Sequence, residues 1–287
     1  MADRDPHSQP RLPARPGLTA TAPDPAALLE LALELADRAG TLLLDSRTHR
    51  GAGAGTKTSG TDVVTDADRA SESLIVEGIL AARPDDGILA EEGTARPGTS
   101  GVRWVIDPLD GTTNYLYGLP AWVVSIGVEV DGVVQAGVVA DPSHGETYSA
   151  VRGSGSRCNG EALRVTGATD LAVSLVATGF AYRPARRAEQ AAALPVVLPA
   201  VRDIRRAGAA ALDLCWVARG RLDGYYETGL KPWDVAAGLL IATEAGAIAC
   251  GFDGGPPSGA SVVAATPGIA AALVGLLAAA GATPDPG

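Results

Sequence analysis

Apolar residues recur at helical spacing in the first regular stretch of the chain. They lie three or four positions apart, which is the pattern of an amphipathic helix with one buried face. These residues are Leu28, Ala32, Leu35, Ala39 and Leu42. Asp24-Pro25 comes just before them and is typical of an N-cap followed by proline in the first turn. The pattern predicts a helix that begins near Pro25 and is broken by the glycine-rich segment Gly51–Gly60.

A second helix and a set of strands follow in the first half. The helix is predicted to begin near Thr65 or Asp66 and to end before Pro84. Asp131-Gly132 lies between two apolar runs and is a strong hairpin signal. The predicted strands are Ile88–Ala90, Val102–Ile106, Trp122–Val130, Val133–Ala140 and Glu146–Val151. This half is therefore predicted to form two helices and a largely antiparallel sheet.

The second half alternates between helix and strand patterns, so the chain is predicted to have a mixed α/β fold. The predicted elements are helices at Arg186–Leu198, Ala209–Ala218 and Val235–Ala245, and strands at Asp223–Tyr226 and Ser261–Ala264. Gly268–Ala282 is too short to cross a bilayer and is predicted to be a terminal helix on the core. We expect a disordered tail at 1–23, an α+β subdomain at 24–152 and an α/β subdomain at 153–287, with a boundary near Gly153-Ser154-Gly155.

The acidic composition argues against one class of function. The 287 residues carry a formal net charge of −10, whereas broad nucleic-acid binding needs a basic surface. No direct nucleic-acid binding is expected, although a local basic pocket for an anionic substrate remains compatible. The three cysteines have no CxxC spacing, which argues against a zinc site. Together with the lack of an apolar signal segment near the N-terminus, they predict a cytoplasmic protein that does not enter a membrane.

Carboxylates at the ends of predicted strands are the candidate chemistry. Asp107 and Asp110 flank Pro108 just after an apolar strand, and the three-residue offset can direct both side chains to one point. Two converging carboxylates repel each other unless a cation lies between them, and oxygen ligands favour Mg²⁺, Mn²⁺ or Ca²⁺. Gly111-Thr112 follows and offers free backbone N–H groups for a phosphate. The same residue types are common in Asx-capped turns, so Asp107–Thr112 alone leaves both interpretations open.

Longer motifs change that balance. The segment Asp107–Asn114 reads DPxDGTxN, and Trp233–Gly238 reads WDxAAG. With Glu91-Glu92-Gly93 upstream, the chain resembles the inositol monophosphatase family from about Lys57 to Ala265. The resemblance implies a layered αβαβα sandwich with a site between two subdomains.

The resemblance also implies roles at the reacting end of the site. The implied metal ligands are Glu91, Asp107, Asp110, Asp234 and the backbone carbonyl of Leu109. Thr112, together with Glu91 and Asp68, resembles the group that positions a nucleophilic water. Gly111 and Thr112 would hold the phosphate through their N–H groups. Mg²⁺ is the expected cofactor.

Further implied roles concern the substrate and a loop. Glu227 resembles the acid that binds polyol hydroxyls, and Arg205 resembles a substrate-side arginine. Asp110 and Asp234 would also contact the substrate, and Asp234 would help to protonate the leaving alkoxide. The implied loop residues are Lys57 and Asp62, the latter in a segment similar to DxVTxxD that ends at Asp68. Ala209 departs from the Ser or Thr of many relatives and leaves ring preference open.

The expected activity is Mg²⁺-dependent hydrolysis of a small polyol phosphate by metal-activated water. Myo-inositol 1-phosphate is the favoured substrate, and histidinol phosphate, fructose 1,6-bisphosphate and 3′-phosphoadenosine 5′-phosphate are alternatives. A non-catalytic interaction role is a further alternative. The resemblance also implies inhibition by lithium and assembly into a homodimer. The expected small-molecule partner is the phosphate ester substrate.

Several aromatic and acidic residues outside these motifs are predicted to have no part in catalysis. Trp104, Trp122 and Trp216 are predicted to be core residues. Asp85 and Asp86 are predicted to lie in a solvated loop, and Asp213 is assigned no role.

Overall fold

The structure is a computed structural model that describes residues 23–48, 54–56 and 63–285. Lys57, Asp62 and nearly all of the predicted tail at 1–23 lie outside the described residues. Among the described helices, none has the length and apolar composition to cross a bilayer.

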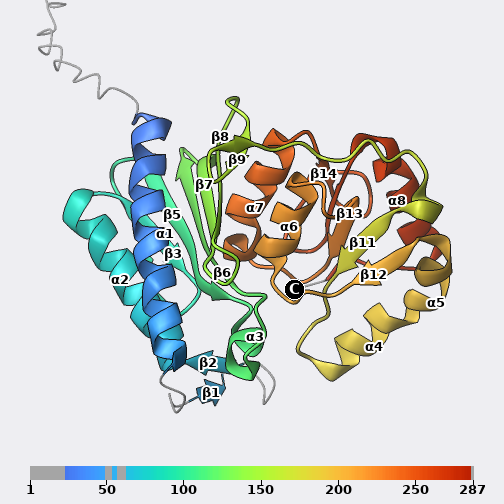
Figure 1. Ribbon diagram of the computed structural model, residues 1–287, viewed down its shortest axis with the longest axis horizontal. Coiled ribbons are helices and arrows are strands. Elements are labelled where there is room, and N and C mark those ends of the chain that lie inside the picture. Colours follow the sequence, from blue (N-terminus) through green and yellow to red (C-terminus); the bar gives the residue numbers. More distant parts are fainter. Residues whose placement is uncertain (1–22, 49–53, 57–62, 286–287) are drawn as a thin grey trace, which may run out of the picture.

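The described chain is built in five layers (Figure 1). Helices α1 (Pro25–Thr48) and α2 (Asp66–Ala82) cover one face of an eight-stranded sheet, and α6 (Ala210–Ala218) and α7 (Pro232–Glu244) lie between that sheet and a five-stranded sheet. The outer face of the second sheet carries α4 (Pro184–Ala192), α5 (Leu194–Val197) and α8 (Pro267–Ala279). This arrangement confirms the predicted αβαβα sandwich.

The first sheet is antiparallel except where β3 pairs with β5. Its order is β10-β9-β8-β7-β6-β5-β3-β4, and β1 (Ala54–Thr56) pairs separately with β2 (Val63–Thr65). The strands are β3 (Gly87–Ala90), β4 (Ala95–Arg96), β5 (Val102–Asp110), β6 (Val123–Val130), β7 (Val133–Asp141), β8 (Glu146–Val151), β9 (Ser156–Cys158) and β10 (Glu161–Ala162). The last two strands follow the predicted boundary near Gly153 and still belong to this sheet.

The second sheet has the order β12-β11-β13-β15-β14. Its strands are β11 (Leu175–Thr178), β12 (Asp203–Arg205), β13 (Gly224–Glu227), β14 (Ile248–Cys250) and β15 (Val262–Ala265). Of these strands, only β13 and β15 correspond to strands predicted from the sequence. The single helix predicted at Arg186–Leu198 is wrong, because α4 ends at Ala192 and α5 starts at Leu194 with Pro195 in its first turn. Proline lacks the N–H that a continuous helix would need there.

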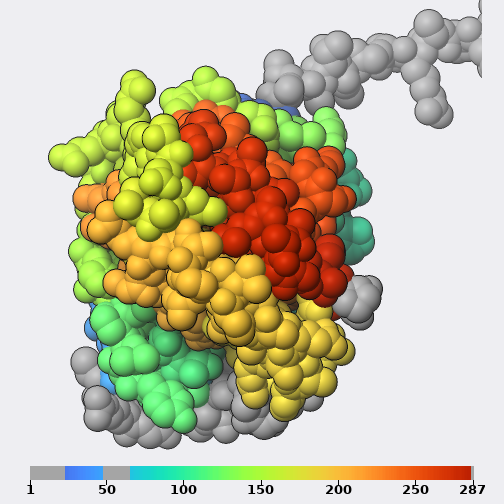
Figure 2. All heavy atoms as spheres, turned by 90° about the vertical axis from the view of Figure 1, so that its right-hand side faces the viewer, coloured from blue at the N-terminus to red at the C-terminus, as the bar shows by residue number. Residues whose placement is uncertain are grey.

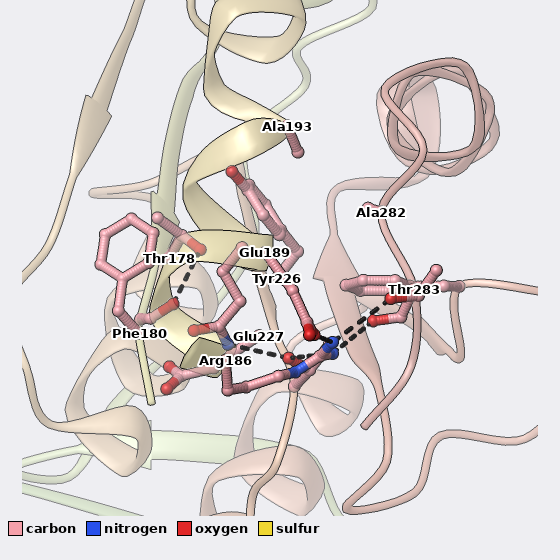
Figure 3. A pocket seen from close by; sticks show the side chains of 13 residues that line it. Thr178, Phe180, Arg186, Glu189, Ala193, Tyr226, Glu227, Ala282 and Thr283 are labelled. Carbon is pink, nitrogen blue, oxygen red and sulfur yellow. Dashed lines mark hydrogen bonds and ion pairs between the residues drawn. The ribbon is translucent and has the colours of Figure 1, made fainter. Parts of the chain in front are cut away.

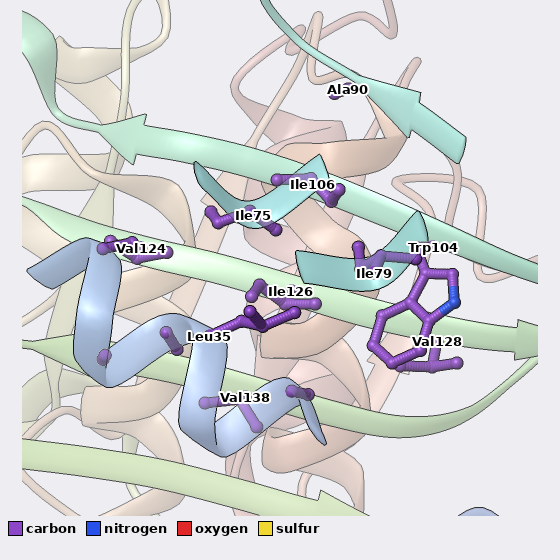
Figure 4. Close-up of a cluster of buried hydrophobic side chains, with 14 of the residues drawn as sticks. Leu35, Ile75, Ile79, Ala90, Trp104, Ile106, Val124, Ile126, Val128 and Val138 are labelled. Atoms are coloured by element: carbon purple, nitrogen blue, oxygen red, sulfur yellow. The ribbon is translucent and has the colours of Figure 1, made fainter. Parts of the chain in front are cut away.

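The largest apolar core lies between the first sheet and its two covering helices (Figure 4). Leu35 from α1 and Ile75 and Ile79 from α2 meet the apolar face of the sheet, and all three are fully buried. Trp104 and Trp122 are fully buried in the same core, as predicted. This packing fixes α2 against β5, the strand whose end carries the candidate site.

The prediction for Asp86 is wrong. Asp85 is exposed, but Asp86 is only 1% exposed. Its carboxylate accepts hydrogen bonds from Trp104 Nε1 at 2.9 Å and Ser100 Oγ at 2.6 Å, and it is paired with Arg83. Asp86 is therefore a buried structural acid that organises the turn between α2 and β3.

Candidate active site

The end of β5 bends because its pairing with β6 shifts between Asp107 and Asp110. Asp107 still pairs with Ser125, whereas Asp110 pairs with Val123, so β5 contains one extra residue at this point. Pro108 cannot donate to the sheet, and Oδ1 of Asp107 instead accepts a hydrogen bond of 3.0 Å from the N–H of Leu109. The bulge lies between Asp107 and Asp110 and takes their carboxylates out of the regular alternation of the strand.

Gly111 makes the turn from β5 into the short helix α3 (Thr112–Tyr117). Its φ of 93° lies in the left-handed region that favours glycine. A Cβ at this position would lie 2.7 Å from the carbonyl oxygen of Ala121. Both the backbone conformation and the available space therefore require glycine.

Thr112 meets a buried carboxylate from α2. Its Oγ1 lies 3.0 Å from Oδ1 of Asp68 and 3.1 Å from the carbonyl oxygen of Leu109. Asp68 is fully buried and forms a capping box with Thr65, whose N–H donates to Oδ2 at 2.9 Å. The structure thus brings together three residues that the sequence analysis assigned to the reacting end.

Asp110 connects the first sheet to the second half of the chain. Its Oδ2 accepts a hydrogen bond of 2.8 Å from the N–H of Ala211, in the first turn of α6. Asn114 makes a second connection, because its Nδ2 donates to the carbonyl of Ala121 at 2.6 Å and to that of Ala207 at 2.8 Å. These bonds hold the start of α6 beside the β5 bulge.

Asp234 is the third residue of α7 and caps it, accepting a 2.6 Å hydrogen bond from the N–H of Lys231. Close packing of α7 on the first sheet sets its position. A Cβ at Gly127 would lie 2.7 Å from Cβ of Ala236, and one at Gly137 would lie 2.9 Å from Cα of Ala237. The small residues that follow Asp234 therefore let α7 approach the sheet and bring this carboxylate to the site.

Burial and neighbouring carboxylates raise the pKa of three aspartates of the site. Burial is the main cause for Asp107, whose pKa lies well above its ordinary value, and repulsion from Glu91, Asp110 and Asp234 adds to it. Burial likewise raises the pKa of Asp110 to about 7, against hydrogen bonds from the start of α6 that lower it. The pKa of Asp234 is also well above its ordinary value, through burial and repulsion from Asp110 and Glu91. The four acids therefore form one electrostatically coupled group.

This group has the donor chemistry for a hard divalent cation. Carboxylate oxygens and the Leu109 carbonyl are ligands that Mg²⁺ prefers, and a cation would offset the repulsion that raises these pKa values. Within the described part of the chain, no three His, Cys, Asp or Glu side chains are already arranged to hold an ion. Asp110 and Asp234 instead accept hydrogen bonds from backbone N–H groups.

Glu227 lies at the end of β13, on the other side of the site. Its Oε2 accepts a 2.7 Å hydrogen bond from the Tyr225 hydroxyl, and burial raises the pKa of its carboxyl to about 7. Gly179 makes room for this carboxylate, because a Cβ there would lie 2.0 Å from Oε2. Repulsion between Glu227 and Asp110 places this acid in the same electrostatic environment as the metal-ligand candidates.

The arginine that acts on Glu227 is Arg206. The positive charge of Arg206 opposes the rise in the pKa of Glu227. Arg205 and Arg206 are both exposed, and Arg205 pairs with Asp203 at 2.6 Å. The resemblance implies a substrate role for Arg205, whereas the positive charge that acts on Glu227 and Asp213 is that of Arg206. Arg206 follows the last residue of β12, so no strand pattern in the sequence separates the two neighbours.

Asp213 on α6 is assigned no role from the sequence, but it lies among the charged groups of the site. It is 1% exposed, and its pKa is well above the ordinary value because of burial and repulsion from Glu227 and Asp110. Arg206 opposes that rise. The apolar neighbours of Asp213 in the sequence gave no sign of these interactions.

A pocket opens beside Glu227 on the outer side of the second sheet (Figure 3). Tyr226 lines it, and Arg186 from α4 reaches across it to donate to the carbonyl of Thr283 at 2.6 Å. Arg186 also donates to Thr228 Oγ1 at 3.3 Å. These bonds tie the C-terminal segment to the loop that follows Glu227.

Comparison with known proteins agrees with this architecture. The model of the family described as "Inositol monophosphatase family" matches residues 24–282. The chain is 48% identical over 232 residues to an inositol-1-monophosphatase of Mycobacterium leprae, covering 77% of this chain and 80% of that protein. It is 41% identical over 234 residues to the Nus factor SuhB of Escherichia coli, covering 79% and 86%.

Solved structures agree as well. The extragenic suppressor protein suhB of Bartonella henselae superposes with a TM-score of 0.84 at 36% identity, covering 88% of this chain and 98% of that chain. With the family model matching nearly all of the described residues, the chain belongs to the inositol monophosphatase family.

Proposed function

We propose that the protein is a Mg²⁺-dependent phosphatase that hydrolyses myo-inositol 1-phosphate. The observation that carries this proposal is the coupled group of Glu91, Asp107, Asp110 and Asp234 beside the Thr112–Asp68 hydrogen bond. Membership of the family and the name of the mycobacterial relative support phosphatase activity and this substrate.

Glu91, Asp107, Asp110, Asp234 and the Leu109 carbonyl would hold the cation. When bound, Mg²⁺ would offset negative charge on the phosphate and on the departing alkoxide.

The chain's own groups would orient the reactants. Gly111 and Thr112 would hold phosphate oxygens through their N–H groups. The hydroxyl of Thr112, which donates to Asp68, would orient the attacking water by accepting a hydrogen bond from it, and the carboxylate of Glu91 would take up the proton of the water. Asp234 would help to return a proton to the leaving oxygen.

Glu227 would accept hydrogen bonds from the polyol hydroxyls at the other end of the site. Its bond to Tyr225 and the space left by Gly179 set its orientation. Arg206 lies close enough to influence Glu227 electrostatically and is therefore the better candidate than Arg205 for a substrate-side cation.

A panel of phosphate esters tests the proposal. The purified protein would be given myo-inositol 1-phosphate, histidinol phosphate, fructose 1,6-bisphosphate and 3′-phosphoadenosine 5′-phosphate, with Mg²⁺ or with EDTA. We expect the highest kcat/KM for the inositol ester, no turnover with EDTA and inhibition by Li⁺. A higher kcat/KM for histidinol phosphate would overturn the substrate, and full turnover in EDTA would overturn the metal requirement.

A second candidate function is a non-catalytic role in a transcription complex. The observation that favours it is the name Nus factor SuhB carried by relatives such as that of Pasteurella multocida, at 45% identity. The net charge of −10 favours a protein partner over nucleic acid. The test uses a host strain from which the gene for this protein has been deleted. Growth restored by the inactive Asp110→Asn variant would support this role. Growth restored only by the active enzyme would overturn it.

We also propose that the protein forms a homodimer through the segment around α3. Leu116, Tyr117 and Leu119 are exposed there, with Tyr117 at 81%, and Figure 2 shows the segment in green at the lower left of the molecular surface. Light scattering after size-exclusion chromatography should give the mass of two chains, and Tyr117→Asp should reduce it to one. A monomeric wild-type protein would overturn this proposal.

A further inference from the structure

Three polar residues on one face of α2 each bind a different segment of the candidate site. Asp68, Ser71 and Glu72 are three and four positions apart, so they share one face of the helix. All three are buried, with exposed fractions of 0%, 0% and 5%. We propose that Ser71 and Glu72 are positioning residues that set the affinity of the site for its cation. This inference rests on the proposed metal-dependent function.

Ser71 holds the centre of the β5 bulge. Its Oγ donates a 2.9 Å hydrogen bond to the carbonyl oxygen of Pro108. Pro108 separates Asp107 from Leu109, and this is the point at which the pairing of β5 with β6 is interrupted. The carbonyl therefore takes its partner from α2, and the bond ties the ligand-bearing bulge to a rigid helix.

Glu72 holds the turn that follows Glu91. Its Oε2 accepts a 2.7 Å bond from the N–H of Glu92, and its Oε1 accepts bonds from the N–H and Oγ1 of Thr94 at 3.1 and 2.5 Å. At the start of this turn, the N–H of Glu91 donates to the carbonyl of Ile106 in β5 at 3.1 Å. The backbone of Glu91 is therefore fixed by β5 before the turn and by Glu72 after it.

These contacts assign Glu72 an indirect role. Both of its carboxylate oxygens face donors of the 92–94 turn, which leaves them directed at the protein rather than at an ion. Residues that orient metal ligands typically change metal affinity by roughly 10- to 100-fold when they are removed. The same helix face also carries Asp68, so one rigid element sets the bulge, the Glu91 turn and the Thr112 hydroxyl relative to each other.

The test measures Mg²⁺ binding by calorimetry on the full chain without any ester, alongside activity as a function of Mg²⁺. The variants are Ser71→Ala and Glu72→Gln. The matched controls are Ser73→Ala and Glu77→Gln, on exposed positions of the same helix. We expect the Kd for Mg²⁺ to rise at least about tenfold in Glu72→Gln and severalfold in Ser71→Ala. The KM for the ester at saturating Mg²⁺ should stay within about twofold of wild type, and the controls should bind as wild type does.

The outcomes separate this inference from the proposed function. Wild-type protein that binds no Mg²⁺ would overturn the proposed function itself. Wild-type protein that binds Mg²⁺, with a folded Glu72→Gln variant of equal affinity, would overturn only the positioning role. If Glu72→Gln does not fold, Ser71→Ala decides, since it removes one hydrogen bond. A lower Tm with an unchanged Kd for Mg²⁺ would identify a purely structural residue and overturn the inference.

Discussion

The hydroxyl of Thr112 lies 3.0 Å from Oδ1 of Asp68, a carboxylate that is fully buried at the start of α2. The other oxygen of that carboxylate accepts the N–H of Thr65, so the carboxylate cannot rotate without losing the helix cap. Thr112 Oγ1 therefore stands at a fixed point between α2 and the carbonyl of Leu109. A hydroxyl held in this way is suited to orient a water molecule in one direction only.

Removing that hydroxyl should abolish most of the activity without unfolding the protein. Thr112→Val keeps the shape of the side chain and loses both hydrogen bonds, so we expect kcat/KM to fall by about 100-fold or more. Thr112→Ser should retain at least a tenth of wild-type activity because it keeps Oγ. Steady-state kinetics on the inositol ester, with circular dichroism as the folding check, measures both. Thr113→Val is the matched control, and equal losses at Thr112 and Thr113 would contradict this role.

Gly179→Ala should impair substrate binding at the polyol end. The new Cβ would lie about 2 Å from the Glu227 carboxylate, so Glu227 has to move away from its bond with Tyr225. We expect KM to rise by about tenfold or more, since small misplacements of a binding group are costly. Gly275→Ala in α8 is the control, because nothing lies within 4 Å of its added Cβ. An unchanged KM in Gly179→Ala would show that Glu227 does not bind the substrate.

The parts of the site that the sequence predicted are those in which backbone geometry restricts residue type. Asp107, Gly111 and Thr112 stand in a run that needs a proline-interrupted strand, a left-handed glycine and a buried hydroxyl in succession. The same residue types also occur in Asx-capped turns, so the longer motifs are needed to favour a metal site. The layered fold followed from the family resemblance, and the periodicity alone indicated only a mixed α/β chain.

The features that the sequence did not predict depend on contacts between distant segments. Asp86 is predicted to lie in a solvated loop, yet it is buried and accepts a hydrogen bond from Trp104 on β5. Ser71 and Glu72 look like ordinary helix residues until their partners on the bulge and the Glu91 turn are known. Arg205 pairs with Asp203, whereas the charge of Arg206 acts on Glu227, and two adjacent arginines in the sequence give no sign of that difference. These are tertiary contacts, and local patterning carries no information about them.

Asp86→Ala should destabilise the fold, whereas Asp85→Ala should not. Removing the Asp86 carboxylate leaves the Trp104 N–H without its acceptor in a buried site and separates Arg83 from its ion pair. We expect a loss of about 2–3 kcal/mol in the free energy of unfolding. Asp85 is exposed, and its substitution should change stability by less than about 0.5 kcal/mol. Urea unfolding followed by fluorescence measures both variants, and equal effects would contradict the buried role of Asp86.

The raised pKa values of the site acids predict how stability depends on pH when no divalent cation is present. Asp110 and Glu227 have pKa values raised to about 7 from ordinary values of 3.8 and 4.5. Between these limits the unfolded chain has released protons that the folded chain still binds. Stability therefore falls as pH rises where the folded state binds more protons. In EDTA, the contribution of these acids should be full below about pH 4 and should be lost as pH rises through about 7.

Mg²⁺ should reverse that loss, because a cation that binds only the folded chain stabilises it, by about 2.7 kcal/mol at 100 times its Kd. Thermal unfolding in EDTA and in Mg²⁺, at about pH 5 and about pH 8, measures the effect, and the increase in Tm caused by Mg²⁺ should be larger at the higher pH. Asp110→Asn removes one of the repelling charges, so it should raise the Tm in EDTA at the higher pH and reduce the increase caused by Mg²⁺. A Tm in EDTA that rises with pH, or an equal Mg²⁺ effect in Asp110→Asn, would show that these carboxylates are not the ones that share the cation.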